Sequence, residues 1–187
     1  KESLAGRIFE FKVEPLSFKE FLRFKGVNIS NVFIQKEAII DNLKQFLLTN
    51  GFPEIIDFKE EDARKYMKEG VIDKIIYSDF VQVFEVKNTK IVKSIFNIIY
   101  NEPGQIIEIQ KLSKELGISR GILSNYLEYL EEAFLIKRLY NYSRNARKTQ
   151  RKLKKFYSTL TNPLLVGQNF PKLFEQFVSK RNRISLW

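Results

Sequence analysis

Three polar side chains, Arg120, Ser124 and Asn125, have types and a spacing that suit contact with a nucleic acid. Ser124 and Asn125 follow Arg120 by four and five residues, and we expect all three at exposed positions of a helix. An arginine can form two hydrogen bonds to O6 and N7 of guanine, and an asparagine can pair in the same way with N6 and N7 of adenine. We therefore predict contact with double-stranded DNA at these positions. The alternative is a solvent-facing stripe on a helix that binds protein.

A block of one charge sign lies downstream of these three residues. The segment Lys137–Lys155 contains nine basic residues and no acidic one. A solvated surface usually mixes both signs, so this block indicates a polyanionic partner. Contacts of such cations to phosphates supply affinity without selecting a sequence, and the alternative is docking onto an acidic protein surface. The residues expected to contact phosphates are Arg144, Arg147, Lys148, Arg151 and Lys152.

A third pattern, Asp79, Glu85 and Lys87, has the residue types of a metal-dependent nuclease. That chemistry requires carboxylates that hold a divalent cation through their oxygens, with the Glu-x-Lys pair on a strand beside the aspartate. Here the pattern falls on or at the end of a predicted helix. We therefore favour a coincidental match and predict neither catalytic residues nor metal ligands in this chain.

The composition excludes several classes of enzyme. The 187 residues include no cysteine and no histidine, which removes thiolate chemistry, disulfides and any Ser-His-Asp triad. The net charge is +10. Residues 1–90 contain 15 basic and 15 acidic residues, whereas residues 91–187 contain 17 basic and 7 acidic ones, so the whole excess belongs to the second half.

Several features bear on location and completeness. No apolar run is long enough to cross a bilayer and no signal peptide is evident, so we expect a cytoplasmic protein with no membrane partner. Abundant Lys, Glu and Ile without cysteine is typical of a thermophile. The chain begins at Lys1, its only methionine is Met67, and it ends at Trp187. We interpret it as a fragment of a longer protein.

The element that would position Arg120, Ser124 and Asn125 is a helix-turn-helix over Ile109–Leu135. Gly117 suits the left-handed conformation that ends a helix, and Ser119 is a favourable N-cap for the next one. An exposed second helix of this kind can lie in a major groove. The apolar residues that recur at helical spacing are Leu112, Leu116, Ile118, Ile122, Leu123, Tyr126, Leu127 and Leu130.

The first half reads mainly as short helices. The spacing of apolar residues predicts helices over Leu16–Phe24, capped by Ser17, and over Val32–Asn50. A polar helix is expected over Lys59–Gly70, closed by Gly70, and a further helical segment over Val71–Val86. The alternation in Ile8–Val13 predicts a short strand.

The second half predicts a winged helix. A helix over Ile91–Tyr100 and a brief strand at Ile106–Ile107 precede the helix-turn-helix, and two strands over Ile136–Tyr142 and Leu153–Tyr157 flank the basic loop Ser143–Lys152. The expected fold is mainly α, with a small helical lid-like domain followed by a winged helix-turn-helix domain. The domains are residues 1–88, residues 90–160, and a linker with a C-terminal helix over 161–187.

Several separated motifs resemble a family of archaeal AAA+/STAND ATPases. The runs Ser3–Arg7 and Pro15–Leu22 are similar to the end of its nucleotide-binding domain, and Gly51-Phe52-Pro53-Glu54 resembles its lid. Further similar runs are Leu116–Ser119, Ser124–Leu127 and Tyr142–Asn145. The resemblance implies a parent protein that uses ATP and Mg, with Arg7 and Pro53 sensing nucleotide.

The chain departs from this family because no two of its eight glycines lie five residues apart, so no phosphate-binding P-loop exists. The resemblance therefore implies a regulatory, DNA-binding module that holds no cofactor itself and is no ATPase as it stands. The expected partners are the ATPase core of the same protein and, in a homo-oligomer, further copies of the chain. A pure protein–protein interaction module is the alternative.

Overall fold

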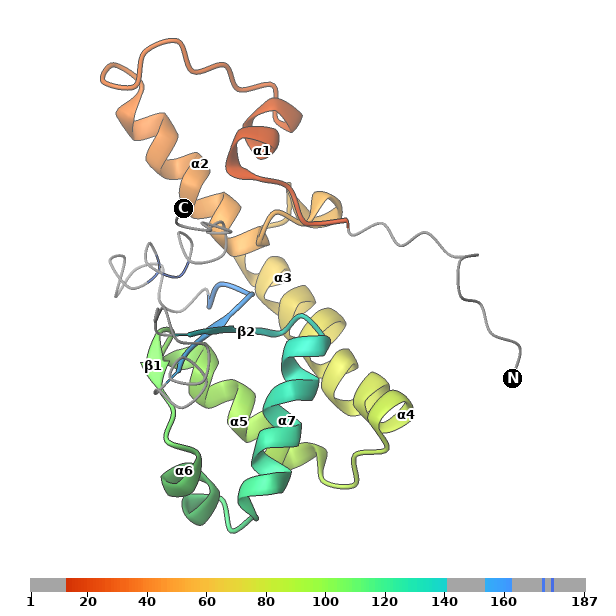
Figure 1. Ribbon diagram of the computed structural model, residues 1–187. Helices are drawn as coiled ribbons and strands as arrows, with labels where there is room; N and C mark the ends of the chain where they lie inside the picture. Colours follow the sequence, from red (N-terminus) through yellow and green to blue (C-terminus); the bar gives the residue numbers. More distant parts are fainter. Residues whose placement is uncertain (1–12, 141–153, 163–172, 174–175, 177–187) are drawn as a thin grey trace, which may run out of the picture.

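The structure is a computed structural model that describes residues 13–140, 154–162, 173 and 176. Figure 1 shows α1 (Phe18–Phe24) and α2 (Lys36–Thr49) at one end of the molecule, with α6 and the start of α7 at the other. The sequence predicted α1 with Ser17 as its cap, and the structure confirms both. Ser17 and Glu20 form a reciprocal capping box at the start of the helix. The predicted strand over Ile8–Val13 lies almost wholly outside the described residues.

Helix α2 begins four residues later than the apolar pattern predicted. Asn31 Oδ1 accepts hydrogen bonds from the amides of Phe33 and Ile34, and Gln35 Oε1 accepts from the amides of Ser30 and Asn31. These side-chain bonds hold a turn in place of a first helical turn. Phe33 is consequently 93% exposed, where the pattern had placed it within the helix.

Gly51 determines how α2 connects to the rest of the chain. The helix ends at Asn50 in the left-handed conformation, and Gly51 follows with φ +74°. Its carbonyl accepts a hydrogen bond of 2.8 Å from the Leu16 amide, and a Cβ at this position would lie 2.4 Å from the Leu16 carbonyl oxygen. Only glycine fits this approach without a backbone shift. A short 3-10 turn, η1 (Pro53–Ile55), comes next.

A long helical rod occupies residues 60–84. It comprises α3 (Glu60–Lys65), the wide-turned π-helical segments η2 (Tyr66–Asp73) and η3 (Ile75–Asp79), and α4 (Phe80–Phe84). The expectation that Gly70 closes a helix was wrong. The rod continues because Met67, Ile72, Ile76 and Phe80 all enter the core on its inner side, and burial of that apolar stripe outweighs the cost of about 1 kcal/mol for a glycine in a helix.

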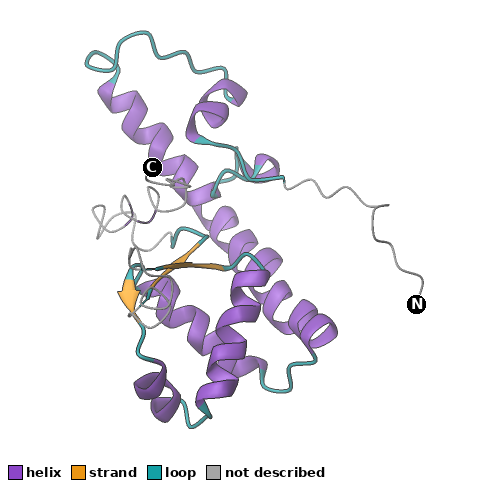
Figure 2. Ribbon diagram, in the orientation of Figure 1, coloured by secondary structure: helices purple, strands orange, loops and turns teal. Residues whose placement is uncertain are grey.

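The second half contains helices and a small sheet in one sequence of elements. α5 (Thr89–Asn101) is followed by β1 (Gln105–Ile106), α6 (Ile109–Glu115), α7 (Arg120–Glu132), β2 (Ile136–Leu139) and β3 (Lys155–Ser158). The three strands form an antiparallel sheet in the order β1-β3-β2, shown in orange in Figure 2. Arg138 faces Phe156 across the β2–β3 pair. The molecule is thus mainly helical with a small three-stranded sheet, as the sequence predicted.

One apolar core joins the long rod to the second half. It runs from Ile55 and Phe80 through Phe96 and Leu127 to Phe156 without interruption. A separate small cluster packs α1 against α2, with Phe21 and Phe46 at its centre. The boundary expected between residues 88 and 90 stays a prediction; the main core is continuous across it.

The segment after β3 ties the two halves together through polar contacts. The amide of Thr161 donates to Asn50 Oδ1 at 2.5 Å, and Asn162 Nδ2 donates to Asn101 Oδ1 at 2.9 Å. Gln176 Nε2 donates to the carbonyls of Ser158 and Leu160, both at 2.8 Å. Leu173 and Gln176 are helical and buried, and the remainder of the predicted C-terminal helix lies outside the described residues.

Across the parts of the chain that the structure describes, no helix combines the length and the apolar character needed to span a membrane.

Candidate functional site

Helix α7 presents the three residues that the sequence singled out. Gly117, with φ +65°, ends α6, and the Ser119 hydroxyl accepts a hydrogen bond of 3.2 Å from the Ile122 amide to cap α7. Leu123, Leu127 and Leu130 are at most 1% exposed and fix the inner face of the helix. Arg120, Ser124 and Asn125 are all exposed.

The inner side of α7 is held by the rest of the fold. Its Tyr129 ring stacks on Phe84 of α4, with the ring centroids 4.3 Å apart and the planes inclined by 14°. Glu131 Oε1, near the end of the helix, accepts a hydrogen bond from the Arg138 amide of β2. The helix is therefore fixed by both the long rod and the sheet, which leaves its outer face as a preformed surface.

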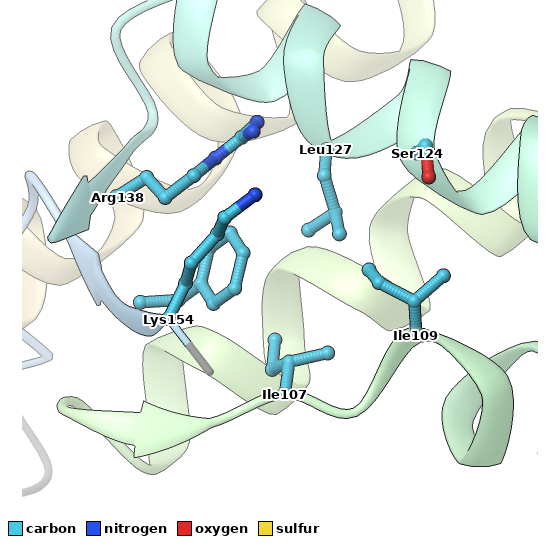
Figure 3. Close-up of a pocket in the computed structure, with 7 residues that line it drawn as sticks. Ile107, Ile109, Ser124, Leu127, Arg138 and Lys154 are labelled. Carbon is cyan, nitrogen blue, oxygen red and sulfur yellow. The ribbon is translucent and has the colours of Figure 1, made fainter. Parts of the chain in front are cut away.

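A small hollow opens where α7, the strands and the start of α6 meet (Figure 3). Its volume is about 80 Å³. This is several times the roughly 10–15 Å³ that one water molecule needs. Ser124 lines it from α7, while Arg138 and Lys154 reach it from the sheet. Its remaining lining residues are apolar: Ile107, Ile109, Leu127 and Phe156.

The two cations of this hollow differ in their partners. Arg138 Nη2 lies 3.0 Å from Glu131 Oε2, and its guanidinium stands over the Phe156 ring at 5.6 Å. Its Nε is buried and has no hydrogen-bond partner among the described residues. Lys154 Nζ lies 5.2 Å from the centre of the Tyr140 ring, and the described residues offer it no carboxylate within salt-bridge distance. The hollow therefore carries a net positive charge.

The outer face of α7 is not uniformly basic. Glu128 and Glu132 are exposed on its second half. Ile122, which the apolar pattern had counted among the helical repeats, is 42% exposed. Positive and neutral polar groups thus occupy the first half of the helix, and negative groups the second.

Several predicted site residues cannot be placed. Arg144, Arg147, Lys148, Arg151 and Lys152 fall in 141–153, outside the described residues, as does Arg7 in 1–12. Pro53 is described: it is exposed and begins the turn η1. The structure therefore places Ser124 at the same hollow as Arg138 and Lys154, and the role of the five basic residues within 144–152 stays a prediction.

Asp79 and Glu85 of the nuclease-like pattern lie at the ends of helical segments. Asp79 ends the wide helical segment η3, and Glu85 is the left-handed cap of α4 with φ +52°. Neither lies on a strand. No group of three acidic side chains in the described residues is arranged to hold a metal ion.

The sequence analysis missed Arg138 and Lys154 as individual site residues, although it counted both in the basic block. The alternation of side chains along the two predicted strands could have identified both residues. Residues two apart on a strand share a face, so Lys154 shares one with Phe156, and Arg138 with Tyr140. Pairing the two predicted strands would have placed both cations on one face of the sheet.

Comparisons with known proteins place the chain in a family. Residues 40–159 match a family described as a domain of unknown function, DUF8612. The chain is 37% identical over 148 residues to the uncharacterized protein MJ1544 of Methanocaldococcus jannaschii, which covers 75% of this chain and 34% of that protein. It is 33% identical over 138 residues to an uncharacterized protein of Haemophilus influenzae, covering 71% of this chain and 33% of that protein.

The chain thus spans about a third of the length of the relatives it matches. No solved structure matches it.

These findings correct the expected membership of the AAA+/STAND ATPases. The matched family and relatives carry no description of an ATPase, of nucleotide binding or of DNA binding. The shared short motifs were too weak to identify a family, so the AAA+ ATPase and STAND labels and the nucleotide-sensing roles of Arg7 and Pro53 are withdrawn, together with DNA binding as a property implied by that family. The chain belongs to the DUF8612 family.

Proposed function

We propose that residues 89–158 form a winged helix that binds a polyanion, with double-stranded DNA as the candidate partner. The element order α5-β1-α6-α7-β2-β3 and the strand order β1-β3-β2 support the winged-helix interpretation. In such a fold the helix that corresponds to α7 is free to enter a major groove. The proposal rests on this chain's own residues, independently of its family.

The observation that carries the proposal is the position of Ser124. It is exposed on α7, as Arg120 and Asn125 are, and it also lines the hollow that holds Arg138 and Lys154. Groups suited to base edges and groups suited to phosphates therefore adjoin on one surface. The sequence between β2 and β3 adds five further cations: Arg144, Arg147, Lys148, Arg151 and Lys152.

An anisotropy titration of a labelled mixed-sequence duplex tests the proposal. We expect Arg120→Ala with Asn125→Ala, and separately Arg144→Ala with Arg147→Ala and Arg151→Ala, to weaken binding. The matched control is Lys19→Ala with Arg23→Ala and Lys44→Ala, which removes three exposed cations from α1 and α2. Binding that falls equally in the triple variant and its control would reduce the effect to net charge and contradict the proposal.

A protein partner is the second candidate function, and the exposed apolar side chain of Ile122 on α7 favours it. Exposed apolar side chains among charged ones are typical of protein interfaces. Ile122→Lys separates the two candidates, because an added cation strengthens or preserves binding to a polyanion and weakens an apolar protein contact. A second copy of the chain is one such partner, and sedimentation of wild type and Ile122→Lys tests it.

The cytoplasmic location predicted from the sequence is part of the same proposal. A DNA partner requires the compartment where DNA is found. Fractionation of cells that express the full-length protein tests it.

A further inference from the structure

We propose that the hollow between α7 and the sheet is an oxyanion site that takes a phosphate group, with Lys154, Arg138 and Ser124 as its donors. The inference rests on the proposed function for its ligand source, because the phosphate would belong to a nucleic-acid backbone. The same chemistry would also accept free phosphate. The experiment below separates these two sources.

The donor set is the first step of the argument. Lys154 supplies an ammonium group, Arg138 a guanidinium group and Ser124 a hydroxyl, and all three side chains line one hollow of about 80 Å³. These are the groups that proteins use to bind phosphate oxygens. Among the described residues, no acidic side chain lines the hollow. Glu131 is the nearby carboxylate that would oppose an anion, and it is engaged by the Arg138 side chain and amide.

The second step is the unsatisfied nitrogen of Arg138. Its Nε is buried without an acceptor among the described residues, although buried donors are almost always hydrogen-bonded. Glu131 contacts the guanidinium of Arg138 through Nη2, so only part of the donor capacity of this group is satisfied. An oxygen bound in the hollow would supply the missing acceptor.

The third step is the environment of the two charges. Phe156 lies beneath the guanidinium and Tyr140 beneath the ammonium, so aromatic faces position both cations. Leu127, Ile107 and Ile109 form the other walls. Apolar walls lower the local dielectric constant and strengthen the attraction of a fixed cation for an anion. The hollow is therefore built for one compact anion at the foot of the exposed α7 face.

The test is a titration of the protein with inorganic phosphate at constant ionic strength, followed by NMR. The signals to follow are the Arg138 Nε–H and the Ser124 amide, with sodium chloride as the comparison salt. We expect both signals to move and to saturate with phosphate but not with chloride. Lys154→Gln should weaken this binding at least tenfold, whereas Lys111→Gln, which neutralises an exposed lysine of α6 outside the hollow, should leave it unchanged.

The duplex titration identifies the source of the phosphate. Neutralising a lysine that contacts one phosphate should reduce the slope of log affinity against log salt by about one, so Lys154→Gln should lower it by that amount and Lys111→Gln should not. Saturable phosphate binding without duplex binding would assign the site to free phosphate and remove the proposed function. If Lys154→Gln leaves the salt dependence of duplex affinity unchanged and phosphate causes no saturable NMR shift, the oxyanion site is contradicted but the proposed function is not.

Discussion

Asn50 and Thr161 lie 111 residues apart in the sequence, yet their buried polar groups bond to each other. Asn50 Oδ1 accepts from the Thr161 amide at 2.5 Å, and Asn50 Nδ2 donates to the Thr161 carbonyl at 3.4 Å. Asn50 is also the left-handed residue that ends α2, with φ +54°. One residue therefore ends a helix of the first half and binds the segment that leaves β3, so the two halves should unfold together.

Substitution of Asn50 should separate its two roles. Asn50→Gly keeps the left-handed backbone but removes both bonds to Thr161, and we expect it to lower the free energy of unfolding by about 1–3 kcal/mol. Asn50→Ala should cost about 1 kcal/mol more, because alanine disfavours the left-handed region. Urea unfolding measures both values. A glycine variant as stable as wild type would show that the bridge contributes nothing.

The stability of the fold should depend on pH through Tyr100. Burial raises the pKa of its hydroxyl well above the ordinary value of 10, an effect that the positive charge of Arg64 offsets only in part. The neutral hydroxyl donates to the Thr161 carbonyl at 3.3 Å. A raised folded-state pKa means that the stabilisation is fully present below pH 10 and is lost as the pH rises above it.

Tyr100→Phe tests this dependence, because phenylalanine keeps the ring and cannot ionise. We expect the wild type to be more stable than the variant by a constant amount below about pH 9. The difference should shrink above pH 10, by at most ~1.4 kcal/mol per pH unit. The free energy of unfolding of both proteins is measured from pH 7 to 11. Taking the difference between them cancels the effect of lysine titration, which is common to both. A difference that stays constant over that range would contradict the assignment.

The stacked pair Phe84 and Tyr129 should couple the long rod to α7. Their ring centroids are 4.3 Å apart, and stacked aromatic pairs contribute about 0.5–1.5 kcal/mol beyond the area that they bury. A double-mutant cycle with Phe84→Leu and Tyr129→Leu measures this coupling in the free energy of unfolding. Effects that add without a coupling term would show that the two rings are neighbours without specific stabilisation.

Glu131 should fix the sheet against the end of α7. Its two oxygens accept from the amide and the guanidinium of Arg138. We expect Glu131→Ala to lower the free energy of unfolding by about 1–2 kcal/mol and Glu131→Gln by less, because glutamine keeps an acceptor for the amide. Since Glu131 is 36% exposed, the part due to charge should weaken in high salt. Equal losses in the two variants would assign the whole effect to the ion pair.

The sequence predicted the second half of the fold well because its signals are local. Ser119 caps α7, Gly117 ends α6, and the apolar spacing of Leu123, Leu127 and Leu130 sets the inner face of α7. These are the features that capping and periodicity rules detect. The pairing of β2 with β3 followed from two short apolar segments that flank a basic loop.

The sequence failed where non-local contacts decide the outcome. Gly70 resembled a helix end, but burial of Ile72 and Ile76 carries the rod through it. The turn before α2 depends on side-chain bonds of Asn31 and Gln35, which compete with the helix that their neighbours favour. The hollow at Arg138 and Lys154 required the register of two strands, and periodicity alone does not provide register.

The dependence of duplex affinity on salt tests the central claim most directly. If the surface around α7 and the basic loop neutralises about five phosphates, log affinity should fall against log salt with a slope of roughly −4 to −5. The variant with Arg144→Ala, Arg147→Ala and Arg151→Ala should flatten this slope by about three, and the matched substitutions of Lys19, Arg23 and Lys44 should leave it unchanged. Absence of duplex binding at low salt, or the same slope in all three proteins, would contradict the account.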